Sequence, residues 1–235
     1  MVVIRSCWIF AVCLWELHVA LISIPFCMQA LAQEFDLNVR EVDIERSESD
    51  DLSSAQLWEQ LFAEIRDGKY NVIIMSPPCG TWSRARFQWQ LHPGPRPQRN
   101  KSWPWGSPWL SAAQRKKVDV ANCFVSQTIQ AAYIASAAGT FFLIEHPEDL
   151  GSVNGEYPAS IWQLEDMRDL QIATEATTWA IFQCAFGADT SIPPGFFLQY
   201  RASSRAMRSG RHLIKMADIW GHCQLGALTS VMSGV

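Results

Sequence analysis

The sequence predicts an α/β fold with a doubly wound, mainly parallel sheet. Two observations carry this prediction. From residue 35 onward, runs that favour strands alternate with runs that favour helices. Two of the strand runs, 71–75 and 141–144, are continuous apolar segments, which are typical of strands in the centre of a parallel sheet. A chain of 235 residues, 49% of them hydrophobic, is long enough for one such domain with a real core.

The expected elements follow one another in a regular order. The β-favouring runs lie at 38–44, 71–75, 141–144 and 178–186. Helices are expected at 53–68, 111–138 and 158–170. Ser53 and Gln56 are placed as a capping box, and Gly68 and Gly139 stop the first two helices. The predicted domain therefore spans residues 33–187, and residues 188–235 are expected to be irregular.

The first 32 residues are strongly apolar and admit three interpretations. Ala30-Leu31-Ala32 resembles a cleavage site, which indicates a secretory signal or a membrane anchor. Alternatively, the segment is a buried first strand and helix, with the strand at 8–12, or it is foreign to the domain. Glu16 and His18 interrupt the apolar run before it reaches the roughly 18 residues of a membrane span. Localisation follows the interpretation: secretory or membrane-bound with a signal, intracellular or nuclear otherwise.

Seven cysteines are scattered along the chain without a Cys-x-x-Cys pair. This spacing favours neither a disulfide framework nor a zinc site. Most of the cysteines are therefore expected to be small buried apolar residues, and no metal site is predicted.

Polar residues follow three of the expected strands, at the edge where an open α/β sheet binds ligands. The strand at 71–75 runs into Ser76-Pro77-Pro78-Cys79, the strand at 141–144 runs into Glu145, and the first strand runs into Asp43 and Glu45. Two consecutive prolines hold Cys79 rigidly just beyond the sheet.

Two arginines follow this cysteine closely. A thiol is only slightly ionised at neutral pH, and Arg84 and Arg86 supply positive charge that favours the thiolate. A lone Pro-Cys is more often a buried cysteine after a turn, but its neighbours favour a nucleophile here.

Pro77-Pro78-Cys79 after an apolar strand resembles the nucleophile motif of DNA cytosine-5 methyltransferases. The run Phe-Leu-Ile-Glu145-His146 is similar to that family's next strand, which ends in Glu-Asn-Val. The resemblance covers about residues 36–187 and implies a Rossmann-like methyltransferase fold. It implies that Cys79 attacks C6 of a cytosine flipped out of DNA, and that Glu145 contacts the N3 edge of the ring. The expected methyl donor is S-adenosylmethionine.

The resemblance also implies residues around the cofactor. Asp43 or Glu45 would hold the ribose hydroxyls, Asp51 would contact the adenine, and Ser76 and Pro77 would border the cofactor. Alternatively, Asp51 sits ahead of a helix N-terminus and favours its dipole. The chain has no glycine before Gly68, so the family's glycine-rich cofactor turn is missing and the fold is expected to be incomplete at its N-terminus.

A basic, aromatic loop follows the Pro-Cys motif. Between Gly68 and Val118 the chain carries nine Lys or Arg residues and no acidic residue, and tryptophans are interleaved with them. This composition favours nucleic-acid contact by phosphate binding and base stacking, although the tryptophans individually could pack the loop onto the sheet. The expected nucleic-acid contacts are Trp82, Arg84, Arg86, Arg96, Arg99 and Lys101.

Three hypotheses about function follow. The first is a methyltransferase-like enzyme acting on cytosine in DNA, which the retention of Cys79 and Glu145 favours. The second is a non-catalytic relative that binds nucleic acid, which the missing glycine turn favours. The third, an exported or membrane-associated protein, depends on residues 1–32 alone.

Overall fold

The computed structural model describes residues 2–5, 38–43, 47–88, 96–181 and 196–200. These residues combine helices with a six-stranded sheet, a mixture of helix and strand that is compatible with the predicted α/β class. The expected first strand at 8–12, most of the apolar segment 1–32 and residue Glu45 lie outside the described residues. None of the described helices is long and apolar enough to cross a membrane.

Six short strands form the sheet, in the order β2-β1-β3-β4-β6-β5. They are β1 (Val2–Arg5), β2 (Asn38–Glu41), β3 (Val72–Met75), β4 (Phe141–Pro147), β5 (Thr177–Ile181) and β6 (Phe196–Tyr200). β3 and β4 are parallel neighbours at the centre, with Met75 opposite Ile144. This parallel pair is the part of the predicted sheet that the structure confirms.

The remaining pairings correct the expectation of a mainly parallel sheet. β1 is antiparallel to both β2 and β3, and β6 is antiparallel to both β4 and β5. The sheet is therefore mixed, because β1 and β6 are inserted against the direction of their neighbours. Each inserted strand separates two strands that run the same way, so β2, β3, β4 and β5 all end at the same edge of the sheet.

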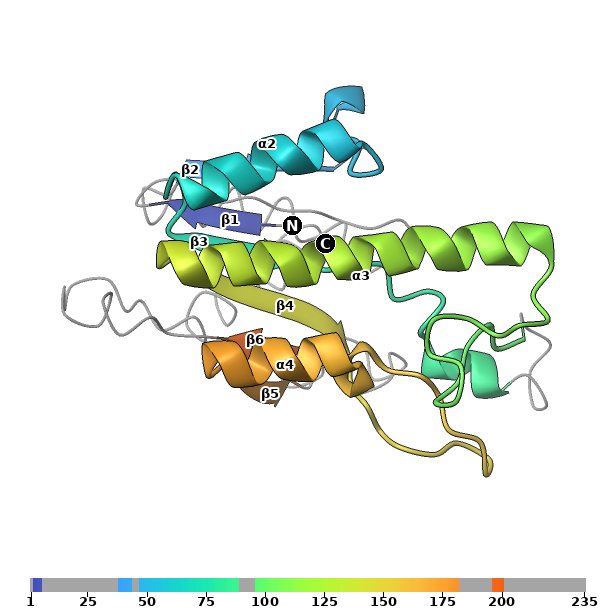
Figure 1. The fold of residues 1–235 in the computed structure, drawn as a ribbon. Coiled ribbons are helices and arrows are strands. Elements are labelled where there is room, and N and C mark those ends of the chain that lie inside the picture. The colour runs from blue at the N-terminus through green and yellow to red at the C-terminus, as the bar shows by residue number, and fades with distance from the viewer. Residues whose placement is uncertain (1, 6–37, 44–46, 89–95, 182–195, 201–235) are drawn as a thin grey trace, which may run out of the picture.

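Three long helices lie side by side in one layer, with α3 in the middle (Figure 1). They are α2 (Ala55–Arg66), α3 (Ala112–Ala138) and α4 (Glu165–Thr174). Short 3-10 helices occur at η1 (Glu48–Asp50), η2 (Arg84–Gln88) and η3 (Ile161–Gln163). The described helices thus cover one face of the sheet, whereas a doubly wound sheet has helices on both faces.

Local signals explain where the helices begin and end. Gly139 ends α3 in the left-handed conformation, as predicted, and Ser111 and Gln114 form a reciprocal capping box at its start that was not predicted. At α2 the side chain that caps the helix is Ser54, which accepts from the amide of Leu57, and not the expected Ser53. Ser53 instead donates to Asp51, so the cap is shifted by one residue.

The core lies between the sheet and the helix layer. Ile73 and Met75 of β3 and Phe142 and Ile144 of β4 are buried in the same cluster as α2 and α3. Side chains alternate between the two faces of a strand. Glu145, next to Ile144, therefore lies on the face that points away from the helices.

The region expected to be irregular contributes a strand. β6 lies between β4 and β5 and pairs with both, although it is separated from β4 by about 50 residues of sequence. The run Phe-Phe-Leu-Gln-Tyr favours strand locally, but its short length carries no periodic signal beyond itself. The described part of the expected strand at 178–186 is β5, which begins at Thr177, and residues 182–186 lie outside the described residues.

Candidate active site

The Pro-Cys loop begins where β3 ends. Pro77 is buried against the core side, whereas Ser76 and Cys79 are partly exposed. The prolines have no amide hydrogen and cannot continue the ladder, so the chain leaves the sheet here. It then turns back on itself, because the amide of Trp82 donates to the carbonyl of Cys79 at 2.8 Å. This turn holds Cys79 at the carboxyl edge of the sheet.

Glu145 is hydrogen-bonded to the start of the same loop. The Ser76 hydroxyl donates to Glu145 Oε2, and the other carboxyl oxygen, Oε1, is buried and receives no hydrogen bond from the described part of the chain. Burial raises the pKa of Glu145 to about 7, and the bond from Ser76 partly counteracts this rise. Near neutral pH the carboxyl group is therefore present in both protonated and ionised forms.

Cys79 and Glu145 are brought to the ends of adjacent parallel strands. Ser76 contacts Glu145 directly, and Cys79 follows Ser76 by three residues of rigid, Pro-rich chain. The strand order thus confirms the predicted adjacency of the two loops.

His146 lies on the opposite face of β4 from Glu145. Its ring is fully buried between the indoles of Trp82 and Trp162, with centroid distances of 6.1 and 6.4 Å. Burial lowers the pKa of His146 to about 3, so the imidazole is neutral. Neither ring nitrogen has a hydrogen-bond partner within the described residues. The Glu-His pair of the sequence is therefore split, with His146 facing the helix layer.

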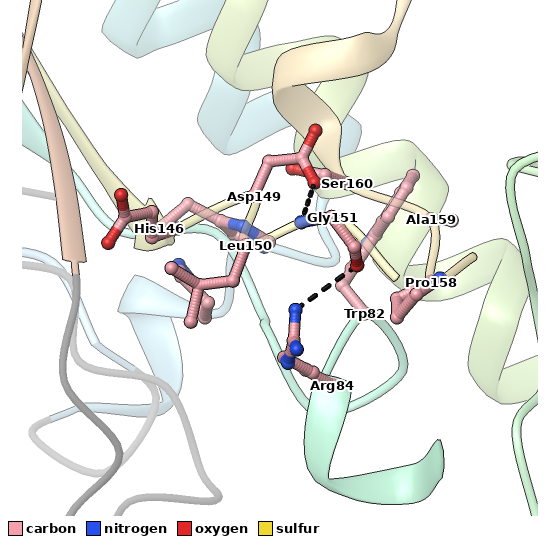
Figure 2. A pocket seen from close by; sticks show the side chains of 11 residues that line it. Trp82, Arg84, His146, Asp149, Leu150, Gly151, Pro158, Ala159 and Ser160 are labelled. Carbon is pink, nitrogen blue, oxygen red and sulfur yellow. Dashed lines mark hydrogen bonds between the residues drawn. The ribbon is translucent and has the colours of Figure 1, made fainter. Parts of the chain in front are cut away.

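A pocket opens beside His146, at the end of β4 (Figure 2). Its walls come from the turn after the Pro-Cys loop and from the segment that follows β4. The lining residues are Trp82, Arg84, His146, Pro147, Glu148, Asp149, Leu150, Gly151, Pro158, Ala159 and Ser160. Cys79 and Glu145 are not among them, so this pocket and the Cys79–Glu145 pair are neighbouring but distinct features.

Two of the expected nucleic-acid contacts prove to be buried. Trp82 is 3% exposed and Arg99 is 1% exposed, so neither reaches a phosphate or a base in this conformation. The Arg99 guanidinium lies 3.8 Å from the centre of the Trp82 ring and donates to Thr81 Oγ1 at 2.7 Å. It also donates to the Pro104 carbonyl and to Asn122 Oδ1, both at 2.8 Å. Arg99 therefore joins the Pro-Cys loop to the basic loop and to α3.

The other four expected contacts differ in their surroundings. Arg84 is partly exposed and donates to the carbonyls of Gly151 and Ser152, at 3.1 and 2.9 Å, which ties the two loops at the pocket together (Figure 2). Arg86 donates through Nε to the carbonyl of Gly80. Arg96 and Lys101 are exposed, and the Lys101 ammonium lies 5.7 Å from the centre of an aromatic ring, that of Tyr157. Arg96 and Lys101 are thus the most accessible of the set.

The exposed aromatic residues of the loop were not singled out from the sequence. Trp103, Trp105 and Trp109 are 45, 39 and 68% exposed, whereas Trp82 is buried. The sequence shows the tryptophans as equivalent, because all stand among basic residues, prolines and glycines. In the structure the carbonyl of Pro104 accepts a hydrogen bond from the buried Arg99, and the indoles of Trp103 and Trp105 on either side of it are exposed.

The residues expected to contact the cofactor differ in their surroundings. Asp43 is buried just beyond the end of β2, at the same edge of the sheet as Ser76 and Glu145. Asp51 accepts two hydrogen bonds from Ser53, through its amide and hydroxyl, both at 2.8 Å. This local turn before α2 favours the interpretation of Asp51 as a residue of the helix start. Pro77 is buried, and Ser76 is engaged with Glu145.

Within the described ranges no group of three or more His, Cys, Asp and Glu side chains is arranged to hold a metal ion. Comparison with known proteins finds no family model that matches the chain, and no significant match among curated proteins or solved structures.

Proposed function

We propose that the chain is a cytosine-5 methyltransferase-like enzyme that acts on DNA, with Cys79 as the nucleophile and Glu145 as the acid that orients the base. One observation carries the proposal. Glu145 sits beside the Pro-Cys loop with one carboxyl oxygen held by Ser76 and the other, Oε1, buried without a partner in the described residues. A buried polar atom without a partner costs free energy, and the N3 edge of a cytosine would satisfy it once the partly exposed side chain of Glu145 turns toward the base.

The raised pKa of Glu145 suits this role. A carboxyl group with a pKa of about 7 carries its proton in much of the protein at neutral pH, which an ordinary glutamate does not. A protonated Glu145 would donate to N3 of the cytosine. The addition of a nucleophile at C6 places negative charge on the ring, and this proton transfer would offset it.

In the proposed reaction the Cys79 thiolate forms a bond to C6, while N3 takes the proton from Glu145 and C5 becomes a carbon nucleophile. S-adenosylmethionine, when bound, supplies the methyl group to C5 and leaves as S-adenosylhomocysteine. Loss of the C5 proton to water and departure of the Cys79 thiolate from C6 then restore the aromatic ring. The N3 proton returns to Glu145, so the enzyme ends in its starting state.

The residues present fit S-adenosylmethionine in part. Asp43 lies at the correct edge of the sheet to meet the ribose, and Pro77 borders the same edge. Asp51 is occupied by Ser53, which leaves no adenine contact assigned to it. The connection of β3 to β4 through α3 is the parallel crossover expected in a Rossmann-like fold, and it supports the methyltransferase-like architecture that we propose.

A second candidate is a non-catalytic relative that binds nucleic acid. The absence of glycine before Gly68 favours it, because the cofactor turn of the family requires glycine. In this alternative the Cys79–Glu145 pair would be a remnant, and the basic loop alone would be functional.

The trapping of an adduct tests the first candidate. Purified protein is incubated with DNA containing 5-fluorocytosine and with methyl-labelled S-adenosylmethionine, and covalent complexes are separated under denaturing conditions. The fluorine at C5 cannot leave as a proton does, so the adduct at Cys79 persists. We expect a labelled complex that Cys79→Ala abolishes.

Cys123→Ala is the matched control, because Cys123 is an exposed thiol on α3 and does not belong to the Pro-Cys loop. Glu145→Gln should slow adduct formation by about 100-fold or more, as expected for the loss of a general acid. If no complex forms, or if Cys123→Ala abolishes it and Cys79→Ala does not, the proposed reaction is wrong. DNA binding without cofactor binding would instead support the non-catalytic candidate.

A further inference from the structure

The basic loop exposes an unusual amount of indole surface. Trp103 is 45% exposed and Trp109 is 68% exposed, and the two rings meet edge to face with their centroids 6.3 Å apart. Large aromatic side chains dominate binding energetics, and clustered exposed apolar residues mark interaction sites. Two paired indoles facing solvent therefore indicate an interaction surface.

The backbone holds these indoles in place before any partner binds. The amide of Trp103 donates to the carbonyl of Asn100 at 3.0 Å and to its side chain at 2.9 Å. The amide of Ser107 donates to the carbonyl of Gln98 at 2.9 Å, and the guanidinium of Arg115, on α3, donates to the Ser107 carbonyl at 2.6 Å. The buried Arg99 bonds the Pro104 carbonyl beneath the loop. A preorganised surface loses less conformational entropy on binding.

The exposed charged residues nearest to the two indoles in the sequence are mostly positive. Lys101 lies two residues before Trp103 and is exposed, and the exposed Lys116 and Lys117 follow Trp109 in the first turns of α3. The exposed acids that come nearest in sequence or contact are Asp119 on α3 and Glu156, beside Tyr157. Stacking surfaces bordered by cations are typical of proteins that bind single-stranded nucleic acids, because every base has a π-face and every nucleotide a phosphate.

We infer that Trp103 and Trp109, with Lys101, Lys116 and Lys117, form a stacking platform that binds single-stranded nucleic acid. A duplex hides the faces of its bases, so two exposed indoles favour an unpaired strand. Trp105, which lies between the two indoles in the sequence, meets the ring of Trp82 edge to face at 6.4 Å, and the amide of Trp82 bonds the Cys79 carbonyl. The role of the platform in delivering a cytosine depends on the proposed function, whereas the binding itself does not.

Fluorescence anisotropy without any methyl donor tests the platform. The probes are a labelled DNA strand of about ten nucleotides, the RNA strand of the same sequence and the corresponding DNA duplex. We expect the single strands to bind more tightly than the duplex, and Trp103→Ala and Trp109→Ala each to weaken single-strand binding by about 5- to 150-fold. Preference for DNA or for RNA then identifies which single strand the platform serves.

Tyr133→Ala is the matched control, because Tyr133 is an exposed aromatic residue on α3 outside the loop. Trp103→Phe should retain most of the affinity, since a phenyl ring still stacks. Lys101→Gln should lower the slope of log affinity against log salt by about one unit. Thermal melting of each variant checks that the fold is intact, as expected for exposed side chains.

Wild-type affinity in both tryptophan variants would overturn the platform, and so would equal binding of the duplex. Tryptophan-dependent binding to vesicles of anionic lipid, with no binding to either single strand, would assign the surface to a membrane and reject the inference. The adduct assay separates this inference from the proposed function. If an adduct forms at Cys79 but the tryptophan variants bind single strands as tightly as the wild type, only the platform is rejected. If no adduct forms but the tryptophan variants bind single strands more weakly, only the enzyme is rejected.

Discussion

The hydroxyl of Ser76 donates a hydrogen bond to the carboxyl of Glu145 across 69 residues of sequence. The contact depends on the register of β3 and β4, because Met75 is opposite Ile144 and the next residue of each strand is therefore also opposite. The same register buries Glu145 Oε1 without a described partner. One pairing of two short strands thus sets both the position and the protonation of the candidate acid.

Glu145→Gln should change how stability depends on pH. The pKa of Glu145 is about 7 in the folded protein against an ordinary value of 4.5. Between these values the folded protein keeps a proton that the unfolded chain releases, so the free energy of unfolding falls as the pH rises through this window. The total loss is about 3 kcal/mol. Glutamine does not ionise, so urea denaturation should show the variant gaining stability relative to the wild type from pH 5 to pH 8.

Glu59→Gln provides the comparison for this measurement, because Glu59 is an exposed carboxyl on α2. Its stability difference from the wild type should stay nearly constant over the same range. A constant difference for Glu145→Gln as well would contradict a buried carboxyl with a raised pKa.

His146→Phe should remove a component of acid sensitivity. The pKa of His146 is about 3 in the folded protein against 6.5 ordinarily, because burial between Trp82 and Trp162 disfavours the charged ring. The stabilising contribution of the neutral, buried His146 is present above pH 6.5 and is lost as the pH falls. Below pH 6.5 the imidazole binds a proton in the unfolded chain but stays neutral in the folded protein. The loss is about 1.4 kcal/mol per pH unit below 6.5.

The measurement compares the wild type with His146→Phe by denaturation at pH 7 and pH 5. Between these values the wild type should lose about 2 kcal/mol relative to the variant. The nearby charges, the Arg99 guanidinium and the carboxyls of Glu148 and Asp149 at the pocket, are present in both proteins and cancel in the difference. Parallel stability curves would show that His146 is protonated when folded.

The features of the fold that could be predicted from the sequence are those set by local residues. Gly139 and the predicted bounds 111–138 of α3 could be read from the residues of the helix itself, and the apolar run of β3 predicts a central strand through its composition. The adjacency of the Pro-Cys loop and Glu145 followed from the rule that a strand, a helix and a strand form a parallel pair. These features require no knowledge of distant partners.

The features that could not be predicted are those set by packing between residues far apart in the sequence. The direction of β1 and the insertion of β6 depend on pairings with distant strands, which short apolar runs do not specify. Arg99 was expected to bind phosphate, yet it is buried because neutral acceptors and the Trp82 ring surround its guanidinium. The composition of a loop does not show which of its basic residues are buried and hydrogen-bonded to the loop, as Arg99 is, and which are exposed to solvent.

Arg99→Met should destabilise the protein by about 2–4 kcal/mol. The substitution roughly keeps the volume of the side chain but leaves Thr81, the Pro104 carbonyl and Asn122 without their donor. Arg96→Met is the control, because Arg96 is exposed and its removal should cost at most about 1 kcal/mol. Urea denaturation at pH 7 measures both variants. Equal, small effects would show that Arg99 is not the residue that joins the loops.

Gly106→Ala should destabilise the protein more than Gly68→Ala. Both glycines have positive φ angles, +117° at Gly106 and +68° at Gly68, so an added side chain strains the backbone at each. At Gly106 the new Cβ would also lie 2.7 Å from Cγ1 of the buried Val118 and 2.8 Å from the Arg115 guanidinium. At Gly68 no other atom lies within 4 Å.

We expect Gly106→Ala to exceed Gly68→Ala by about 1–3 kcal/mol in urea denaturation, since Val118 is packed against the core and cannot yield. The displaced segment carries the indoles of Trp105 and Trp109, so Gly106→Ala should also weaken binding of single-stranded nucleic acid, whereas Gly68→Ala should not. An equal loss in the free energy of unfolding in the two variants would mean that the backbone at Gly106 shifts to accommodate the added Cβ. The platform would then not be held rigidly against α3.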